Sequence, residues 1–122
     1  DLNLPVDVVG APILREADGL AMSSRNRYLD APARARAVAI AEGLRAAYDA
    51  YAGGARDPGQ LAGLVRARVS PDFDAIDYIE AADPDSLEPL TEARERQVIL
   101  VAARLGTTRL IDNLELGHDA RP

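Results

Sequence analysis

Cysteine, lysine and tryptophan are all missing from this 122-residue sequence, and histidine occurs only once. Without cysteine the chain has neither a disulfide framework nor a thiolate metal site. The one histidine, His118, follows Gly117 in a polar C-terminal stretch, where we expect disorder rather than a ligand or base. We therefore expect no histidine-centred general base in this chain, and we predict no metal site.

Long hydrophobic runs are missing as well. No apolar stretch approaches the roughly 20 residues that a membrane-spanning helix needs, and no charged start followed by an apolar run marks a signal peptide. These features favour a soluble, cytoplasmic protein without a membrane partner. The sequence begins with Asp1 rather than Met and soon enters a strand-like run, which predicts a fragment of a longer protein.

Positive charge is scarce and scattered. The chain has 14 basic residues, all arginine, against 20 acidic ones, which gives a net charge of -6. No basic stripe is interleaved with aromatic residues, so a nucleic-acid partner is disfavoured. Aromatic residues make up only 4% of the chain, whereas apolar residues, mainly Ala and Leu, make up 48%. This composition favours helices or a mixed fold over an aromatic-rich sandwich.

The order of sequence patterns predicts an α+β fold. Asp30 followed by Pro32 marks a helix start, Gly53-Gly54 marks its stop, and Asp57-Pro58 repeats the start signal. We expect a two-helix layer packed on a small three-stranded antiparallel sheet, preceded by an N-terminal edge strand and a nucleotide-contacting loop. The expected ranges are 7–14 for the edge strand, 30–52 and 57–70 for the helices, and 73–82, 97–104 and 107–116 for the sheet.

Two groups of residues invite a functional reading that we do not adopt. Tyr48 and Tyr51 have helical spacing beside Leu44, which is typical of the edge of a core rather than of a base-stacking pair. The acidic cluster Asp83, Asp85 and Glu88 lacks the glycine-centred loop of a calcium site, so we interpret it as a solvated turn. Residues 92–96 follow as a charged spacer.

The stretch 15–29 carries the strongest functional signal. Ser23 and Ser24 offer hydroxyl donors behind the glycine turn at Asp18-Gly19, and Arg25 adds a planar guanidinium that suits phosphate. If a helical turn opens there, its unpaired backbone N–H groups point at the same anion. Ser and Asn are also ordinary turn and cap residues, so a capped turn is the alternative.

The residues around this loop help to decide between a phosphate site and a capped turn. Residues 18–26 read Asp-Gly-Leu-Ala-Met-Ser-Ser-Arg-Asn and are followed by Tyr28 and Leu29. This run resembles the signature that opens the C-terminal domain of the pantothenate synthetase (pantoate:beta-alanine ligase) family. Residues 8–13 resemble the strand that leads into the motif, and residues 99–113 resemble the closing hairpin. The resemblance therefore covers nearly the whole chain.

The resemblance implies a role in ATP binding. It assigns Leu14 to the adenine-bearing end of ATP, and it aligns the loop Met22, Ser23, Ser24 and Arg25 with the family's second phosphate-binding loop. Mg²⁺ is then held mainly through ATP. Asn26, Tyr28 and Leu29 match the motif and could serve only to fix the loop onto the first helix.

The resemblance also implies which parts of the enzyme this chain contains and which it lacks. Residues 1–14 form an interdomain strand, 15–117 the C-terminal ATP-lid domain, and 118–122 a tail. The missing partner is an N-terminal Rossmann-like domain with two signature histidines, which contributes to binding pantoate and beta-alanine. The whole enzyme is expected to be a homodimer that joins these substrates through a pantoyl adenylate, releasing AMP and pyrophosphate. This fragment carries no catalytic residue of its own and should be inactive alone.

Two other hypotheses remain open at this stage. The chain could be a stand-alone α+β interaction or dimerisation module, or a nucleotide-binding regulator. A regulator would bind ATP tightly alone, an interaction module would ignore it, and a ligase domain would bind it well only with its partner domain.

Overall fold

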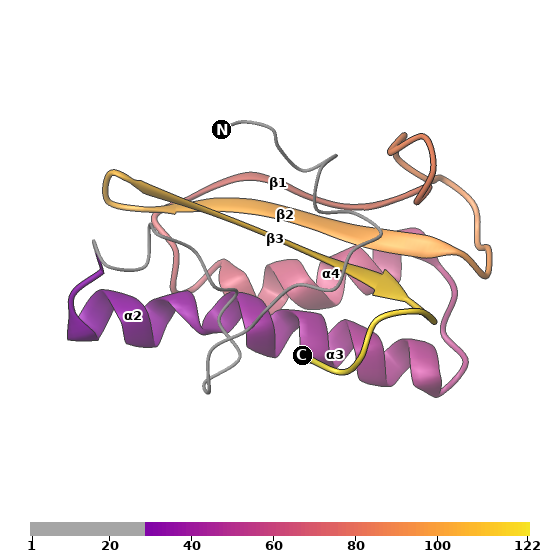
Figure 1. Ribbon diagram of the computed structural model, residues 1–122, viewed down its shortest axis with the longest axis horizontal. Helices are drawn as coiled ribbons and strands as arrows, with labels where there is room; N and C mark the ends of the chain where they lie inside the picture. The colour runs from indigo at the N-terminus through magenta and orange to yellow at the C-terminus, as the bar shows by residue number, and fades with distance from the viewer. Residues whose placement is uncertain (1–28) are drawn as a thin grey trace.

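The computed structural model describes residues 29–122, which form three helical segments and one antiparallel sheet (Figure 1). The order of elements is that expected of an α+β domain, with the described helices before the sheet. The bounds are α2 Ala31–Ala37, α3 Ala39–Ala52, α4 Pro58–Val69, β1 Ala75–Ala82, β2 Gln97–Leu105 and β3 Thr108–Leu116. The predicted edge strand at 7–14 and the nucleotide-contacting loop lie outside the described residues.

The first predicted helix is present, with one interruption. Asp30 caps it as expected, because its Oδ1 accepts the backbone N–H of Ala33 at 2.9 Å, and Pro32 lies in the first turn. Val38 separates α2 from α3 but keeps helical dihedral angles, φ −62° and ψ −18°. The backbone N–H of Val38 reaches the Arg34 carbonyl at 3.3 Å, so the helix is loosened there rather than broken.

The second helix is also capped by its predicted residue. Asp57 Oδ2 accepts the backbone N–H of Gln60 at 2.9 Å, and Pro58 begins α4. Gly54, with φ +113°, ends the preceding helix region in a conformation that favours glycine. A Cβ atom on Gly43 would lie 3.1 Å from both the Cα and the carbonyl oxygen of Val65. Glycine at this position therefore allows α3 and α4 to pack closely.

The sheet has the strand order β1-β2-β3, with both neighbouring pairs antiparallel. β2 and β3 are joined by the two-residue loop Gly106-Thr107, and Leu105 pairs with Thr108. Gly106 has φ +59°, which suits the first loop position of a type II′ hairpin turn. The three predicted strands and the hairpin are thus confirmed, to within two residues at each boundary.

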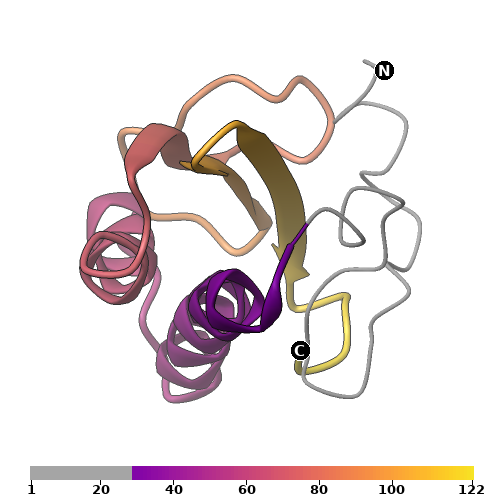
Figure 2. The same cartoon turned by 90° about the vertical axis from the view of Figure 1, so that its left-hand side faces the viewer.

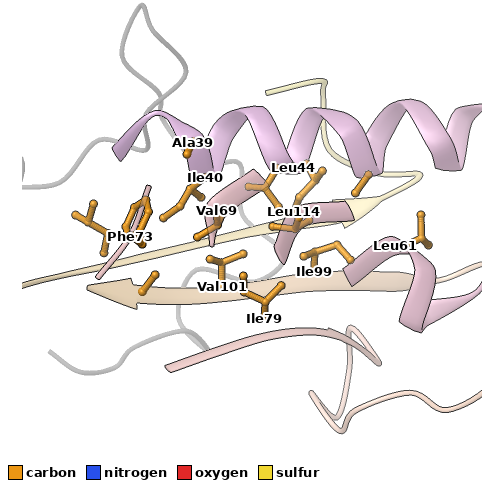
Figure 3. Packing of buried hydrophobic residues seen from close by; sticks show 14 of the residues in the cluster. Ala39, Ile40, Leu44, Leu61, Val69, Phe73, Ile79, Ile99, Val101 and Leu114 are labelled. Atoms are coloured by element: carbon orange, nitrogen blue, oxygen red, sulfur yellow. The ribbon is translucent and has the colours of Figure 1, made fainter. Parts of the chain in front are cut away.

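The main core lies between the helices and one face of the sheet, as the end-on view shows (Figure 2). Ile40 and Leu44 of α3 meet Ile99 and Val101 of β2 in this layer (Figure 3). Alternate residues of β2 face the opposite way, and Val98 and Leu100 form a second, smaller cluster with Ala82. These observations confirm the predicted two-layer α+β architecture. No helix within residues 29–122 is long and apolar enough to cross a membrane.

The C-terminal stretch folds back onto α3, which corrects the expectation of disorder for His118 and its neighbours. Arg121 forms a two-pronged ion pair with Asp49, with both nitrogen–oxygen distances at 3.0 Å. This hydrogen bonding from Arg121 lowers the pKa of Asp49. Arg45 Nε donates to the backbone oxygen of Pro122 at 2.7 Å. Sequence reasoning missed these contacts because they join residues more than 70 positions apart.

Candidate functional site

The predicted ATP-contacting residues lie outside the part of the chain that the structure describes. They are Leu14, Met22, Ser23, Ser24 and Arg25. The structure does describe the residues to which this stretch is joined. Leu29 is partly buried and packs against the main core, and Asp30 caps α2 directly after it. The last residue of the motif is therefore in contact with the core, while its role in fixing the loop stays a prediction.

Helix α2, the residues just before β1 and the loop between β2 and β3 are joined by hydrogen bonds. Arg36 of α2 donates from Nε to the carbonyl of Asp72 at 2.7 Å and from Nη2 to Asp74 Oδ1 at 3.0 Å. The other carboxylate oxygen of Asp74 accepts the backbone N–H of Gly106 at 2.7 Å. These bonds, first that from Gly106 and then that from Arg36, lower the pKa of Asp74. One carboxylate thus ties α2 to the β2–β3 hairpin.

A second charged cluster lies on the sheet face opposite the helices. Asp77 accepts Arg109 Nε at 2.7 Å and Arg104 Nε at 3.1 and 3.2 Å on its two oxygens. The hydrogen bond from Arg109 contributes most to lowering the pKa of Asp77, and Arg104 adds to it against a partial loss of solvation. Arg104 and Arg109 are themselves direct cross-strand partners. The two guanidiniums therefore share this carboxylate.

An irregularity in β1 positions Asp77 for this role. The register of β1 against β2 shifts between Ile76 and Tyr78, which leaves Asp77 as an extra residue in the strand. Ile76 and Ile79 both pack against the main core, while Tyr78 packs against the smaller cluster on the opposite face. The bulge therefore places two consecutive residues, Asp77 and Tyr78, on the face away from the helices.

The acidic turn after β1 is held by arginines. Asp83 Oδ1 accepts the backbone N–H groups of Asp85 at 2.7 Å and Ser86 at 3.1 Å, and its Oδ2 accepts Arg94 at 2.6 Å. The Asp85 N–H contributes most to lowering the pKa of Asp83. Arg96 in turn pairs with the Asp85 carboxylate at 3.0 Å. Among residues 29–122, no group of three His, Cys, Asp or Glu side chains is arranged to hold a metal ion.

Residues 92–96 do more than separate two strands. Arg56 lies with its guanidinium carbon 3.7 Å from the centre of the Tyr51 ring and bonds Glu95 at 3.0 Å. Tyr51 donates its hydroxyl to the Glu95 carbonyl at 2.8 Å. Gln97 is fully buried and donates to the carbonyls of Arg56 and Arg94 at 2.6 and 2.8 Å. The predicted core-edge position of Tyr51 is confirmed, and the polar contacts around it are structural.

The fold has close counterparts among solved structures. The pantothenate synthetase of Thermus thermophilus is similar with a TM-score of 0.78 and 35% sequence identity. The similarity covers 88% of this chain but 39% of that protein. By its fold, then, the chain belongs with α+β domains that form part of larger enzymes.

Sequence comparison assigns the family. The chain belongs to the pantoate-beta-alanine ligase family, whose model matches residues 1–115. It is 50% identical to the pantothenate synthetase of Magnetococcus marinus over 123 residues, covering all of this chain and 42% of that protein. It is 44% identical to a bifunctional pantoate ligase/cytidylate kinase of Synechococcus elongatus, covering 95% of this chain and 22% of that protein. The chain thus spans less than half the length of these relatives.

The family match confirms the resemblance drawn from the sequence. The matched residues 1–115 include positions 14 and 22–25, on which the predicted ATP contacts rest. The individual roles of those five residues stay predictions. The alternative of an unrelated interaction module loses support, because such a module would have no reason to match a ligase family along most of its length.

Proposed function

We propose that this chain is the ATP-lid domain of a ligase that condenses pantoate with beta-alanine to give pantothenate. The observation that carries the proposal is the family match over residues 1–115, which includes the Ser-Ser-Arg loop. The chain spans 42% of the Magnetococcus marinus relative, which leaves room in the whole enzyme for a further domain. In this proposal residues 1–14 form the interdomain strand and 15–117 the C-terminal lid.

The proposed reaction has two steps. A pantoate carboxylate oxygen attacks the α-phosphorus of ATP, so that pantoyl adenylate forms and pyrophosphate leaves. The amine of beta-alanine then attacks the acyl carbon, so that an amide forms and AMP leaves. Mg²⁺, bound mainly through ATP, supplies charge neutralisation for the phosphates.

This chain's own residues serve the first step. Ser23 and Ser24 donate hydrogen bonds to phosphate oxygens, and Arg25 stabilises the charge that develops on the departing pyrophosphate. Met22 completes the loop, and Leu14 contacts the adenine-bearing end of ATP. None of these residues is a general acid or base, so the chain contributes binding and electrostatic stabilisation rather than proton transfer.

The described residues support a lid of this kind. Arg25 is four residues before Leu29, and four residues of extended chain span no more than about 14 Å. Leu29 is partly buried against the core, and the hairpin is fixed to α2 through Asp74. The loop is therefore joined to a rigid part of the fold, as a preorganised phosphate site requires.

The remaining parts of the proposal concern partners. A Rossmann-like N-terminal domain supplies the signature histidines and the rest of the substrate site, and the whole enzyme is a cytoplasmic homodimer. Arg121 and Pro122 of the tail contact α3, which argues that the tail belongs structurally with the lid.

An ATP titration tests the proposal directly. The chain alone should bind ATP weakly and form no pantothenate, whereas adding a separately produced N-terminal part of the Magnetococcus marinus relative should tighten ATP binding and restore turnover. Tight ATP binding by the chain alone would instead indicate a regulator. If ATP binding stays absent in the reconstituted pair while the two parts associate, the lid assignment is wrong.

A further inference from the structure

Helix α2 follows the phosphate loop, residues 22–25, closely in the sequence, so its placement affects how that loop is presented. Of its 7 residues, Ala37 is buried in the main core. One small buried side chain does little to fix the rotation of a helix about its own axis. We propose that Arg36 and Asp74 are positioning residues, which hold α2 in the orientation that lets the loop meet the phosphates of ATP. This inference rests on the proposed function of the loop.

Arg36 supplies the orientation that the packing of Ala37 leaves open. Neighbouring residues of a helix project about 100° apart, so Arg36 leaves α2 in a different direction from Ala37. Its Nε donates to the Asp72 carbonyl at 2.7 Å, and its Nη2 donates to Asp74 Oδ1 at 3.0 Å. Two bonds from one planar guanidinium fix direction as well as distance. The helix is therefore held on one side by the core and on another by the residues before β1.

Asp74 is itself held in place. Its Oδ2 accepts the backbone N–H of Gly106 at 2.7 Å, so the carboxylate that receives Arg36 is also bonded to the turn between β2 and β3. This turn is a tight one, with Gly106 at φ +59°. Asp74 therefore gives α2 a fixed point on the sheet instead of a carboxylate that can follow the helix when it moves.

The exposure of the pair separates positioning from stability. The side chains of Arg36 and Asp74 are 43% and 52% exposed, and exposed ion pairs contribute little to folding. Catalysis is more sensitive to geometry, since a misplacement of about 1 Å can slow a reaction on the order of a hundredfold. Removal of the pair should therefore impair the chemistry of the loop while the domain stays folded.

The first test follows the loop in the whole 122-residue chain without ATP. The backbone N–H signals of Ser23, Ser24 and Arg25 in nitrogen-15 NMR spectra should shift in Asp74→Ala, which removes both bonds of the carboxylate. Asp77→Ala is the matched control, because Asp77 bonds arginines of β2 and β3 rather than of α2. Equal shifts in the control would mean that any loosening of the hairpin disturbs the loop, and would overturn the proposal.

The second test measures adenylate formation in the enzyme reconstituted with the N-terminal part of the Magnetococcus marinus relative. Asp74→Ala and Arg36→Gln should each lower the single-turnover rate at saturating ATP roughly tenfold, because the transition state demands the exact position of the loop. The ATP concentration that gives half the maximal rate should rise less than about threefold. Asp74→Asn keeps an acceptor oxygen and should recover part of the rate. The double variant should be no slower than either single one, because both residues act through one bridge.

Melting curves of all variants complete the test. A rate loss explained by a fall in melting temperature, or losses that add in the double variant, would overturn the proposal. If Asp74→Ala does not fold, Arg36→Gln decides the question. Arg25→Ala separates this inference from the proposed function. A slow Arg25→Ala enzyme beside unaltered rates for Asp74→Ala and Arg36→Gln would overturn the positioning role alone, and an unaltered Arg25→Ala rate would overturn both.

Discussion

Gly43 of α3 faces the backbone of Val65 in α4 so closely that an added Cβ would lie 3.1 Å from the Val65 Cα atom. Gly63 of α4, by contrast, has open space around the same position. The two glycines lie in facing helices but have opposite packing constraints, so they form a natural pair for comparison.

Gly43→Ala should destabilise the domain, because backbone atoms of Val65 cannot move aside as a flexible side chain can. Overpacking of this kind costs more than replacing glycine by alanine gains in helix propensity. We expect the net free energy of unfolding to fall by about 1 to 3 kcal/mol. Gly63→Ala should stabilise it by up to about 1 kcal/mol. Urea unfolding of both variants measures the difference, and equal effects would show that the α3–α4 contact tolerates a methyl group.

The two aspartate caps should contribute similar stability. Asp30→Ala and Asp57→Ala each remove a side-chain oxygen that accepts a backbone N–H of a first turn, at a cost of about 1 kcal/mol. Asp30→Asn and Asp57→Asn should lose much less, since an amide oxygen accepts the same bond. Thermal unfolding of the two Ala variants and the two Asn variants measures this difference in stability. A full loss in the Asn variants would mean that charge rather than capping is responsible.

Acid should lower the free energy of unfolding by removing the contributions of two aspartates near the β2–β3 hairpin. The pKa values of Asp74 and Asp77 are lowered in the folded state, chiefly by the Gly106 N–H and by Arg109 respectively. Their contributions are therefore present above the unfolded pKa near 3.8 and are lost as pH falls through the lower folded values. Unfolding measured from about pH 6 down to about pH 2 should show this loss, and Asp74→Asn should reduce its steepness. An unchanged profile in that variant would contradict the prediction.

His118 should produce a pH dependence of the opposite sign. Asp119, first through its hydrogen bond, and then Glu115 raise the pKa of His118 above 6.5. Its contribution is complete below pH 6.5 and declines as pH rises through the higher folded pKa. His118→Gln should remove this part of the stability profile between about pH 6 and 8 while leaving the acid limb unchanged. A histidine NMR titration with a midpoint at or below 6.5 would contradict it.

Arg25→Ala tests the loop in the reconstituted enzyme. Loss of charge-assisted hydrogen bonds to the triphosphate should slow adenylate formation on the order of ten- to a hundredfold. Arg25→Lys should recover only part, because an ammonium keeps the charge but lacks the planar fork. Single-turnover pyrophosphate release measures the rate, and a melting curve serves as the control. An unchanged rate, or a fall in melting temperature that accounts for the lost rate, would mean that Arg25 is not a phosphate ligand.

The elements that could be predicted from sequence are those set by neighbouring residues. Asp30 and Asp57 mark helix starts through bonds to residues three positions away, and Gly106 marks a hairpin through its own backbone preference. The core stripe of α3 likewise follows from helical spacing. Local physics decides these features, so a single sequence contains enough information to find them.

The contacts that escaped prediction depend on the assembled fold. Arg104 and Asp77 are 27 residues apart, and Tyr51 reaches Glu95 across 44. With 14 arginines and 20 acidic residues, the number of plausible pairings is too large for sequence alone to resolve. The bulge at Asp77 has no glycine or proline signal, and the residues of the ATP loop could be proposed only through the family's pattern.

The near-continuity of α2 and α3 has a mechanical consequence. Residues 31–52 run as one rod about 33 Å long, with Val38 still helical at the junction (Figure 1). Its first end is joined to the loop through Leu29, and its far end is held by the contacts of Tyr51 and Asp49. Such a rod transmits displacement instead of absorbing it. A displacement applied at the Leu29 end of this helix should therefore reach the Tyr51 and Asp49 contacts at its far end, so that residues 31–52 move as one body.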